Sequence, residues 1–145
     1  MPAPGTLITS TTVSRGRFDE IGVRTTGSSD VYVVTNTIAP GGDTGWHTHA
    51  GPSLITVQSG TVMAYEGDDP TCTPRVYQAG SGFMERDGHV HLLRNEGDVD
   101  VVTVAVQIVP ADSERRTDVA PPGNCAFYTR AGPGSQSLSR TEVLQ

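Results

Sequence analysis

Short runs of β-branched residues, each ended by glycine or proline, constrain the fold of this chain more than any other feature. The 145 residues include 17 valines and 18 threonines against six leucines, and 17 glycines and 10 prolines are spread along the sequence. Branching at Cβ suits a pleated sheet and costs rotamer freedom in a helix. Turn signals at regular intervals between such runs are typical of many short strands. The sequence therefore predicts an all-β chain.

The turn signals divide the middle of the chain into short predicted strands. These strands cover residues 31–38, 46–49, 53–58, 61–66, 75–78, 83–86, 89–94 and 99–109. Strands at this spacing favour a small antiparallel β-barrel or jelly roll, which also leaves few exposed sheet edges. The length fits one domain. We expect an N-terminal segment at residues 1–30 with a further short strand around residues 18–24, a core barrel at residues 31–110, and a partly mobile C-terminal extension at residues 111–145.

Charge and hydropathy argue against several classes of partner. The ten basic residues, all arginine, are outnumbered by 16 acidic residues, which gives a net charge of −6. We therefore expect no nucleic-acid partner and no anionic membrane partner, because both need a basic surface. No apolar run approaches the roughly 20 residues that a membrane helix needs. The first residues lack the basic and apolar parts of a secretory signal, so a cytoplasmic location is the default expectation.

Two cysteines, Cys72 and Cys125, lie in segments rich in turn-forming residues. One disulfide between them would tie the C-terminal extension to a loop of the barrel and would stabilise the fold by roughly 4 kcal/mol in the chain-entropy model. The alternative is two free thiols in a reducing compartment. A bridge would argue for an extracytoplasmic protein, and the sequence leaves both possibilities open.

The four histidines carry most of the chemical information in the sequence. They form two H-x-H pairs, His47 with His49 and His89 with His91. Residues two apart on a strand point to the same face, so each pair can present two imidazoles on one side of a sheet. Several imidazoles at one point suit a divalent transition metal. The sequence has no serine nucleophile elbow, no P-loop and no C-x-x-C pair, so nucleophilic hydrolysis and nucleotide binding have little support.

The residues around the histidines resemble the two sequence motifs of the cupin superfamily. Residues 41–60 read G-x5-H-x-H-x3-S-x6-G, which is similar to the first motif, where a glutamate stands at the position of Ser53. Residues 80–95 read G-x5-R-x-G-x2-H-x3-N, which is similar to the second motif, where a proline stands at the position of Arg86. The resemblance covers about residues 31–109 and implies the cupin barrel.

By that resemblance, His47, His49 and His91 are expected to bind one divalent transition metal at a three-histidine site. Serine is a poor metal ligand, so Ser53 would mark a vacant fourth-ligand position. A metal with only neutral protein ligands favours anionic oxygen ligands from a substrate. Three-histidine sites resembling this one occur in iron-dependent dioxygenases, so iron is the leading expectation, while Zn, Ni, Mn or Cu are alternatives.

The resemblance therefore implies a dioxygenase-type oxidoreductase that acts on a small anionic or chelating substrate. Two alternatives stay open: a metal-dependent lyase or isomerase without redox chemistry, and a cupin that binds a small ligand without turnover. His89 and Tyr65 are the candidates for moving a proton, against the alternative of a rim histidine and a core tyrosine. Cupins commonly pair, so a homodimer is expected.

Strand parity predicts the wall of the site. If Ser53 points inward, Ile55 and Val57 follow it on the same face. An apolar wall of this kind strengthens electrostatic interactions at a metal, because it lowers the local dielectric constant. The other candidates for the lining or for contact with a bound ligand are Met63, Leu93, Gln107 and Glu85.

Overall fold

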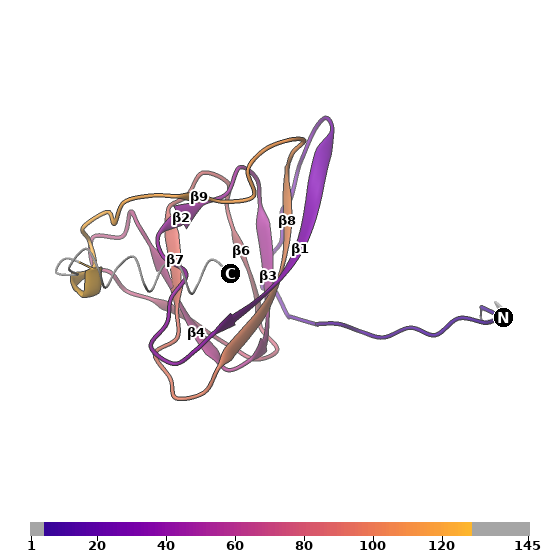
Figure 1. Cartoon of the computed structure of the whole chain (residues 1–145), viewed down its shortest axis with the longest axis horizontal. Coiled ribbons are helices and arrows are strands. Elements are labelled where there is room, and N and C mark those ends of the chain that lie inside the picture. The colour runs from indigo at the N-terminus through magenta and orange to yellow at the C-terminus, as the bar shows by residue number, and fades with distance from the viewer. Residues whose placement is uncertain (1–4, 129–145) are drawn as a thin grey trace.

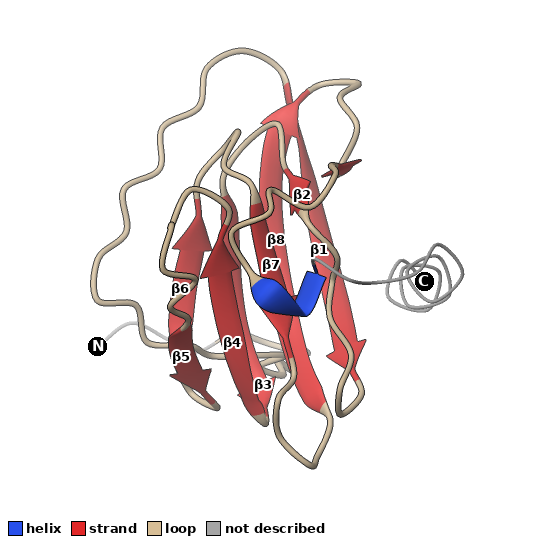
Figure 2. Cartoon of the chain, turned by 90° about the vertical axis from the view of Figure 1, so that its left-hand side faces the viewer, coloured by secondary structure: helices blue, strands red, loops and turns tan. Residues whose placement is uncertain are grey.

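The computed structural model describes residues 5–128, which form two antiparallel sheets (Figures 1 and 2). The strands are β1 (Ser29–Ile38), β2 (His47–Thr48), β3 (Ser53–Ser59), β4 (Thr61–Glu66), β5 (Arg75–Gln78), β6 (Gly82–Glu85), β7 (His91–Arg94), β8 (Val101–Pro110) and β9 (Thr117–Asp118), followed by the 3-10 helix η1 (Ala126–Tyr128). The first sheet has the order β1-β8-β3-β6 and the second has the order β5-β4-β7-β2-β9. The chain passes repeatedly from one sheet to the other, as a jelly roll does.

The prediction of an all-β antiparallel fold is confirmed, with one correction to its shape. Within residues 5–128, no strand pairing joins the edges of the two sheets into a closed barrel. The sheets instead pack face to face, and the side chains of alternating residues fill the space between them. On β3 this alternation is strict, because Ser53, Ile55 and Val57 are buried while the residues between them are partly exposed.

The main core lies between the two sheets. It comprises Ile38, Ile55, Val57, Val62, Phe83, Leu93, Val101 and Ala105. A second cluster lies on the other face of the second sheet, where residues from the C-terminal part of the chain cover it. Its buried members are Trp46, Tyr65, Leu92 and Cys125, with Val119 and Phe127 packed against them. The second sheet is thus buried on both faces around β2 and β7.

Two kinds of motif residue serve the loops between strands. The motif glycines Gly41, Gly60, Gly80 and Gly88 all have positive φ angles, between 74° and 91°, which residues with a Cβ rarely adopt. Asn95 is fully buried, and its side-chain amide donates to the carbonyls of Ile38 (2.8 Å) and Val99 (2.7 Å). Its oxygen accepts from the backbone of Gly97. These contacts join the end of β1 to the loop between β7 and β8.

The N-terminal segment differs from the expectation. Residues 18–24 form no strand, and the segment instead makes one isolated bridge from Arg17 to Ser81. The ring of Phe18 lies directly over Gly82, where any Cβ would clash with it. Packing of this ring replaces the predicted strand pairing. Further along, β1 begins at Ser29, two residues before the predicted start.

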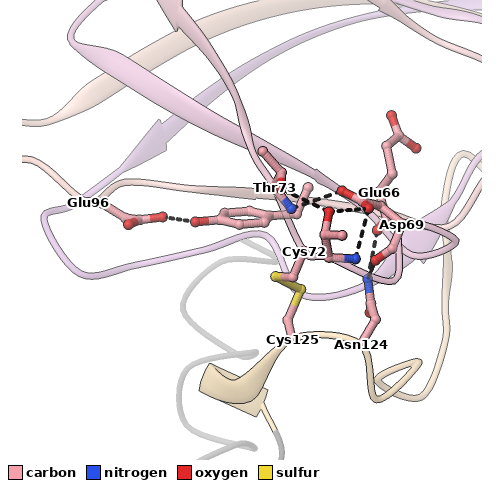
Figure 3. The surroundings of a disulfide bond; sticks show 9 residues. Glu66, Asp69, Cys72, Thr73, Glu96, Asn124 and Cys125 are labelled. Carbon is pink, nitrogen blue, oxygen red and sulfur yellow. Dashed lines mark hydrogen bonds between the residues drawn. A yellow bond between two sulfur atoms is a disulfide. The ribbon is translucent and has the colours of Figure 1, made fainter.

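The C-terminal extension is fastened to the body of the molecule as far as it is described. The strand β9 pairs with β2, and a disulfide joins Cys72 to Cys125 (Figure 3). The amide of Asn124 donates to the carbonyls of Glu66 (3.0 Å) and Asp69 (2.7 Å), beside the disulfide. Residues 129–145, where mobility was expected, lie outside the described part. None of the described helices has the length and apolar character needed to cross a membrane.

Candidate metal centre

Four buried side chains, three imidazoles and one carboxylate, converge between the two sheets. One possible ligand atom from each lies within 4.8 Å of those of the others, and the residues are His47, His49, Glu85 and His91. His47 opens β2, His49 follows this strand, Glu85 ends β6 and His91 opens β7. The group therefore draws on both sheets, with β6 from the first and the histidine-bearing segments from the second.

Strand register brings the imidazoles together. His47 is paired with His91 across β2 and β7, so their side chains share a face, and their ring centroids are 4.3 Å apart. His49 has the same parity as His47, and these two centroids are 4.8 Å apart. From the opposite sheet, Glu85 places one carboxylate oxygen 3.0 Å from His91 Nε2 and the other 3.6 Å from His49 Nε2.

Backbone carbonyls fix the orientation of two of the rings. His47 Nδ1 lies 2.8 Å from the carbonyl oxygen of Gly45, and His49 Nδ1 lies 2.8 Å from that of Arg115. A carbonyl oxygen only accepts, so Nδ1 carries the proton in each ring and Nε2 of the neutral imidazole presents a lone pair to the centre of the group. In metal sites of proteins, the ring nitrogen that does not bind the metal usually donates such a hydrogen bond, which holds the imidazole in place.

The spacing of the donor atoms fits a metal ion. Metal–nitrogen bonds in proteins are about 2.0–2.1 Å long, so two ligands at right angles around one ion lie about 3.0 Å apart. His91 Nε2 is 3.0 Å from His47 Nε2 and 3.0 Å from Glu85 Oε2. Two imidazole nitrogens that face each other this closely need a proton or a cation between them. The four residues therefore could hold a divalent metal ion.

Electrostatics within the group point the same way. Burial alone would raise the pKa of Glu85, but the imidazoles of His91, His49 and His47 hold it well below its usual range. Burial would lower the pKa of His91, and the Glu85 carboxylate outweighs this and raises it. Burial and the charge of His91 keep the pKa of His47 well below its usual value. The Glu85 carboxylate therefore favours a positive charge at the centre of the group, which a divalent cation would supply.

Glu85 is the site residue that the sequence analysis did not place among the ligands. Ser53 occupies the motif position at which other cupins carry the glutamate ligand, and it is completely buried. In the sheet, Ser53 is the direct cross-strand partner of Glu85. The carboxylate is therefore carried by β6, the neighbouring strand, instead of β3. The available signal was a single acidic residue in the otherwise uncharged β6 sequence, at the same parity as Phe83 of the core.

A cavity of about 70 Å³ is lined by three of the four donors, His47, His49 and Glu85. Its lining combines apolar side chains with amides, hydroxyls and two guanidinium groups: Val34, Thr35, Asn36, Thr44, His47, His49, Ile55, Glu85, Leu93, Ala105, Gln107, Arg115 and Arg116. Of the candidates for the lining, Ile55, Leu93 and Gln107 lie on this wall. Val57 is fully buried in the main core, and Met63 packs against the second cluster.

The two candidates for proton transfer lie apart from this cavity. His89 is partly exposed, with Nδ1 3.4 Å from a guanidinium nitrogen of Arg86 and 4.0 Å from a carboxylate oxygen of Glu66. Tyr65 is the register partner of Leu92 and so lies on the opposite face of the sheet from His91. Its hydroxyl donates to the carboxylate of Glu96, a residue that is labelled in Figure 3. Burial and the Glu96 carboxylate raise the pKa of Tyr65 to about 12, as expected for a structural tyrosine.

Comparison with solved structures places the fold among double-stranded β-helix proteins. An uncharacterized conserved protein with a double-stranded β-helix domain from Klebsiella pneumoniae shares 25% identity, with a TM-score of 0.52 over 61% of this chain and 73% of that one. A cupin-like protein from Thermotoga maritima shares 22% identity, with a TM-score of 0.52 over 64% and 65% of the two chains. The DMSP lyase DddQ from Ruegeria pomeroyi shares 20% identity, with a TM-score of 0.52 over 66% and 45%. The last two similarities concern the fold alone.

Sequence comparison gives the family. No protein with a curated description matches the chain. The model of the cupin domain matches residues 34–107, just over half of the chain. The match begins within β1 and ends within β8, so it contains all four donors of the candidate metal centre and excludes the C-terminal extension. The predicted relationship is confirmed: the chain belongs to the cupin domain family.

Proposed function

We propose that this protein is a metal-dependent enzyme that acts as a dioxygenase-type oxidoreductase on a small substrate with anionic oxygen donors. The observation that carries the proposal is the donor set, three buried imidazoles and one carboxylate that converge within 4.8 Å. Nitrogen and oxygen donors of this kind suit first-row transition metals. Iron is the metal that the oxygenase proposal requires first, and Zn, Ni, Mn or Cu fit the same donors.

The surrounding residues would prepare the site for such chemistry. A divalent transition metal held by the four donors would supply Lewis acidity and, where it is redox-active, electron exchange between substrate and dioxygen. Glu85 contributes one negative charge, which leaves a dication with a net positive charge that attracts anionic ligands. Ile55 and Leu93 form an apolar wall that limits water. A volume of about 70 Å³ holds roughly five water molecules, so the substrate has only a few heavy atoms in the cavity.

The composition of the cavity wall supports a redox reaction over proton transfer by a side chain. In the described part of the chain, the carboxylate and the imidazoles on this wall all belong to the metal-binding group itself. The other lining groups are amides, hydroxyls, guanidinium groups and apolar side chains, none of which is a good general base at neutral pH. A lyase or isomerase mechanism would need such a base beside the substrate.

One observation favours the non-redox alternative. A second cavity, of about 410 Å³, is lined by Glu85, His91 and His89. If substrate enters there, the His89 imidazole is placed to move a proton, and the protein would be a metal-dependent lyase or isomerase. The third possibility is a protein that binds a small ligand in one of these cavities and does not convert it.

Metal analysis followed by oxygen consumption tests the proposal. We expect about one equivalent of metal in protein purified without a histidine tag, and almost none in the His47→Ala variant. After anaerobic loading with Fe(II), small carboxylates should cause oxygen uptake that the variant does not show. Turnover with Zn(II) in the absence of oxygen would instead support the lyase or isomerase. The absence of bound metal in the parent protein would overturn the metal-dependent function altogether.

A further inference from the structure

Arg115 is a partly buried cation with no carboxylate partner in the described structure. It belongs to residues 111–118, which follow β8 and which we call the strap; two residues of the strap, Arg115 and Arg116, line the cavity. Its guanidinium lines the cavity and donates to Gln107 Oε1 at 3.2 Å. The neighbouring Arg116 is different, because it forms an ion pair with Asp118 (2.8 Å) and donates to the Thr44 carbonyl. Among residues 5–128, no acidic group lies within ion-pair distance of Arg115.

The surroundings make this charge costly without a counter-ion. Burial and the adjacent Arg116 lower the pKa of Arg115, yet a guanidinium stays protonated in proteins. A charge held partly out of water is stable when an opposite charge completes its hydrogen bonds. The remaining N–H groups of Arg115 are a planar set of donors that matches the two oxygens of a carboxylate.

Strand register places Gln107, the hydrogen-bond partner of Arg115, in the same row of the sheet as the donor Glu85. Gln107, Ser53 and Glu85 are direct partners across β8, β3 and β6, in one row of the first sheet. Adjacent strands are about 4.8 Å apart, so the backbones of β8 at Gln107 and of β6 at Glu85 are about 10 Å apart. Ser53 stands between them with a short side chain, and both neighbours reach the cavity. The gap suits a ligand of a few heavy atoms.

We propose that Arg115, supported by Gln107, recognises the carboxylate of a small substrate whose second donor group faces the metal-binding residues. The inference rests on the proposed function and makes its substrate class specific: short carboxylates with a hydroxyl, keto, amino, thiol or second carboxylate group nearby. It also assigns substrate selection to the strap, which lies outside the matched family region that ends at residue 107. The backbone carbonyl of the same residue orients His49, so changes to the Arg115 side chain leave that support in place.

Binding calorimetry with defined ligands tests the assignment. The probes are glycolate, oxalate and acetate, with acetamide as the neutral match to acetate, titrated into Zn(II)-loaded and metal-free protein. We expect the carboxylates to bind and acetamide to bind at least tenfold more weakly. Arg115→Gln should weaken carboxylate binding by about 10- to 100-fold, the value of a charge-assisted hydrogen-bond pair. Arg115→Lys should lie between the two, because it keeps the charge and loses the planar donor set.

Matched controls separate this inference from the proposed function. Arg24→Gln removes one exposed positive charge that does not line the cavity and should bind carboxylates like the parent. Metal content should be unchanged in the Arg115 variants. Carboxylate binding that is equal in Arg115→Gln and the parent would overturn the inference and leave the metal site intact. A parent protein that takes up no metal and yet binds carboxylates through Arg115 would support the inference and overturn the proposed enzyme.

Discussion

Glu85 and Ser53 show how one donor can change strands without leaving a site. The two residues are direct partners across β3 and β6, and Cβ atoms of such pairs are about 5 Å apart. A glutamate at either position can therefore extend toward the same imidazoles. With glutamate on β6 and serine on β3, the charge of the metal-binding group is kept, and the space between Glu85 and Gln107 stays free for a ligand.

Exchanging the two residues separates these two effects. Glu85→Ser should lower metal affinity by at least about tenfold, because the group loses its carboxylate donor. Adding Ser53→Glu to this variant should restore metal binding, because the new carboxylate reaches the imidazoles from β3. The longer side chain at position 53 should also fill the space between positions 85 and 107 and so weaken glycolate binding. Elemental analysis and calorimetry measure the two quantities. A double variant that still lacks metal would show that position 53 does not reach the donors.

The limits of sequence analysis at this scale follow from register. His47, His49 and His91 could be predicted because their spacing lies within continuous motifs. Glu85 could not be placed among the ligands, because its position depends on which residue of β3 it faces. Arg115 belongs to no motif and reaches the cavity only when the chain folds back over it. Each of the missed residues depends on a contact between segments far apart in the sequence.

The strap is the part of the C-terminal extension that contacts the candidate metal centre. Its start is held by a backbone hydrogen bond from Ala111 to Ser28 (3.0 Å), and its end forms β9 against β2. Beyond it, Val119 donates to the Trp46 carbonyl at 3.0 Å, and the disulfide at Cys125 closes the connection. The orientation of His49 and the position of Arg115 both depend on this element.

Removing the disulfide should loosen the strap. The Cys72→Ser, Cys125→Ser double variant is expected to lose about 2–4 kcal/mol of unfolding free energy, because the unfolded chain is no longer cross-linked. Its metal affinity should also fall, since His49 loses a firmly held carbonyl partner. Urea denaturation and Zn(II) titration measure both. A reducing agent should affect the parent in the same direction and leave the variant unchanged; an equal response of both proteins would contradict the prediction.

Strand positions were predictable where local composition decides them. The β-branched runs of β1, β3, β4 and β8 match the predicted segments closely, because these strands cross the core. Residues 18–24 carry a similar pattern but form no strand, because Phe18 packs on Gly82 and holds the segment in another path. The disulfide, which the sequence left open, forms because the second cluster brings Cys125 to the loop of Cys72.

The whole molecule leaves part of its first sheet uncovered. Val31 and Val33 on β1 are 60% and 68% exposed, and β1 is an edge strand of its sheet. Val106 and Ile108, their neighbours on β8, are only partly buried. Near the N-terminus, Leu7 is fully exposed, and this segment extends away from the body in Figure 1. A second copy of the chain would cover an apolar surface of this kind, and we keep the homodimer as a proposal on this ground.

Oligomeric state tests the homodimer. Light scattering during gel filtration should give about twice the chain mass of 15.3 kDa. Val33→Asp should shift the protein toward the monomer, because a charge would be buried in the contact. Val76→Asp, at a 53% exposed position of the second sheet, is the matched control and should leave the mass unchanged. A parent protein that is monomeric at micromolar concentration would exclude this contact.

At the level of the whole fold, the spacing of the motifs was enough to predict the family. It was not enough to predict whether the two sheets join into a closed barrel. The glycines with positive φ and the buried Asn95 fix the loops of a cupin, so their spacing is visible in the sequence. Whether the sheet edges meet depends on the pairing of β1, β5, β6 and β9 with distant segments, which no local pattern encodes. The sheets therefore form an open sandwich where a closed barrel was expected.

The covalent fastening of the strap has a consequence for how such a protein can diversify. Residues 111–116 lie outside the strands, so their side chains can be exchanged without changing the pairing of the two sheets. The bridge at Cys125 would keep each new version of this segment in place beside the candidate metal centre. A library randomised only in this stretch should therefore yield folded proteins that prefer different small acids.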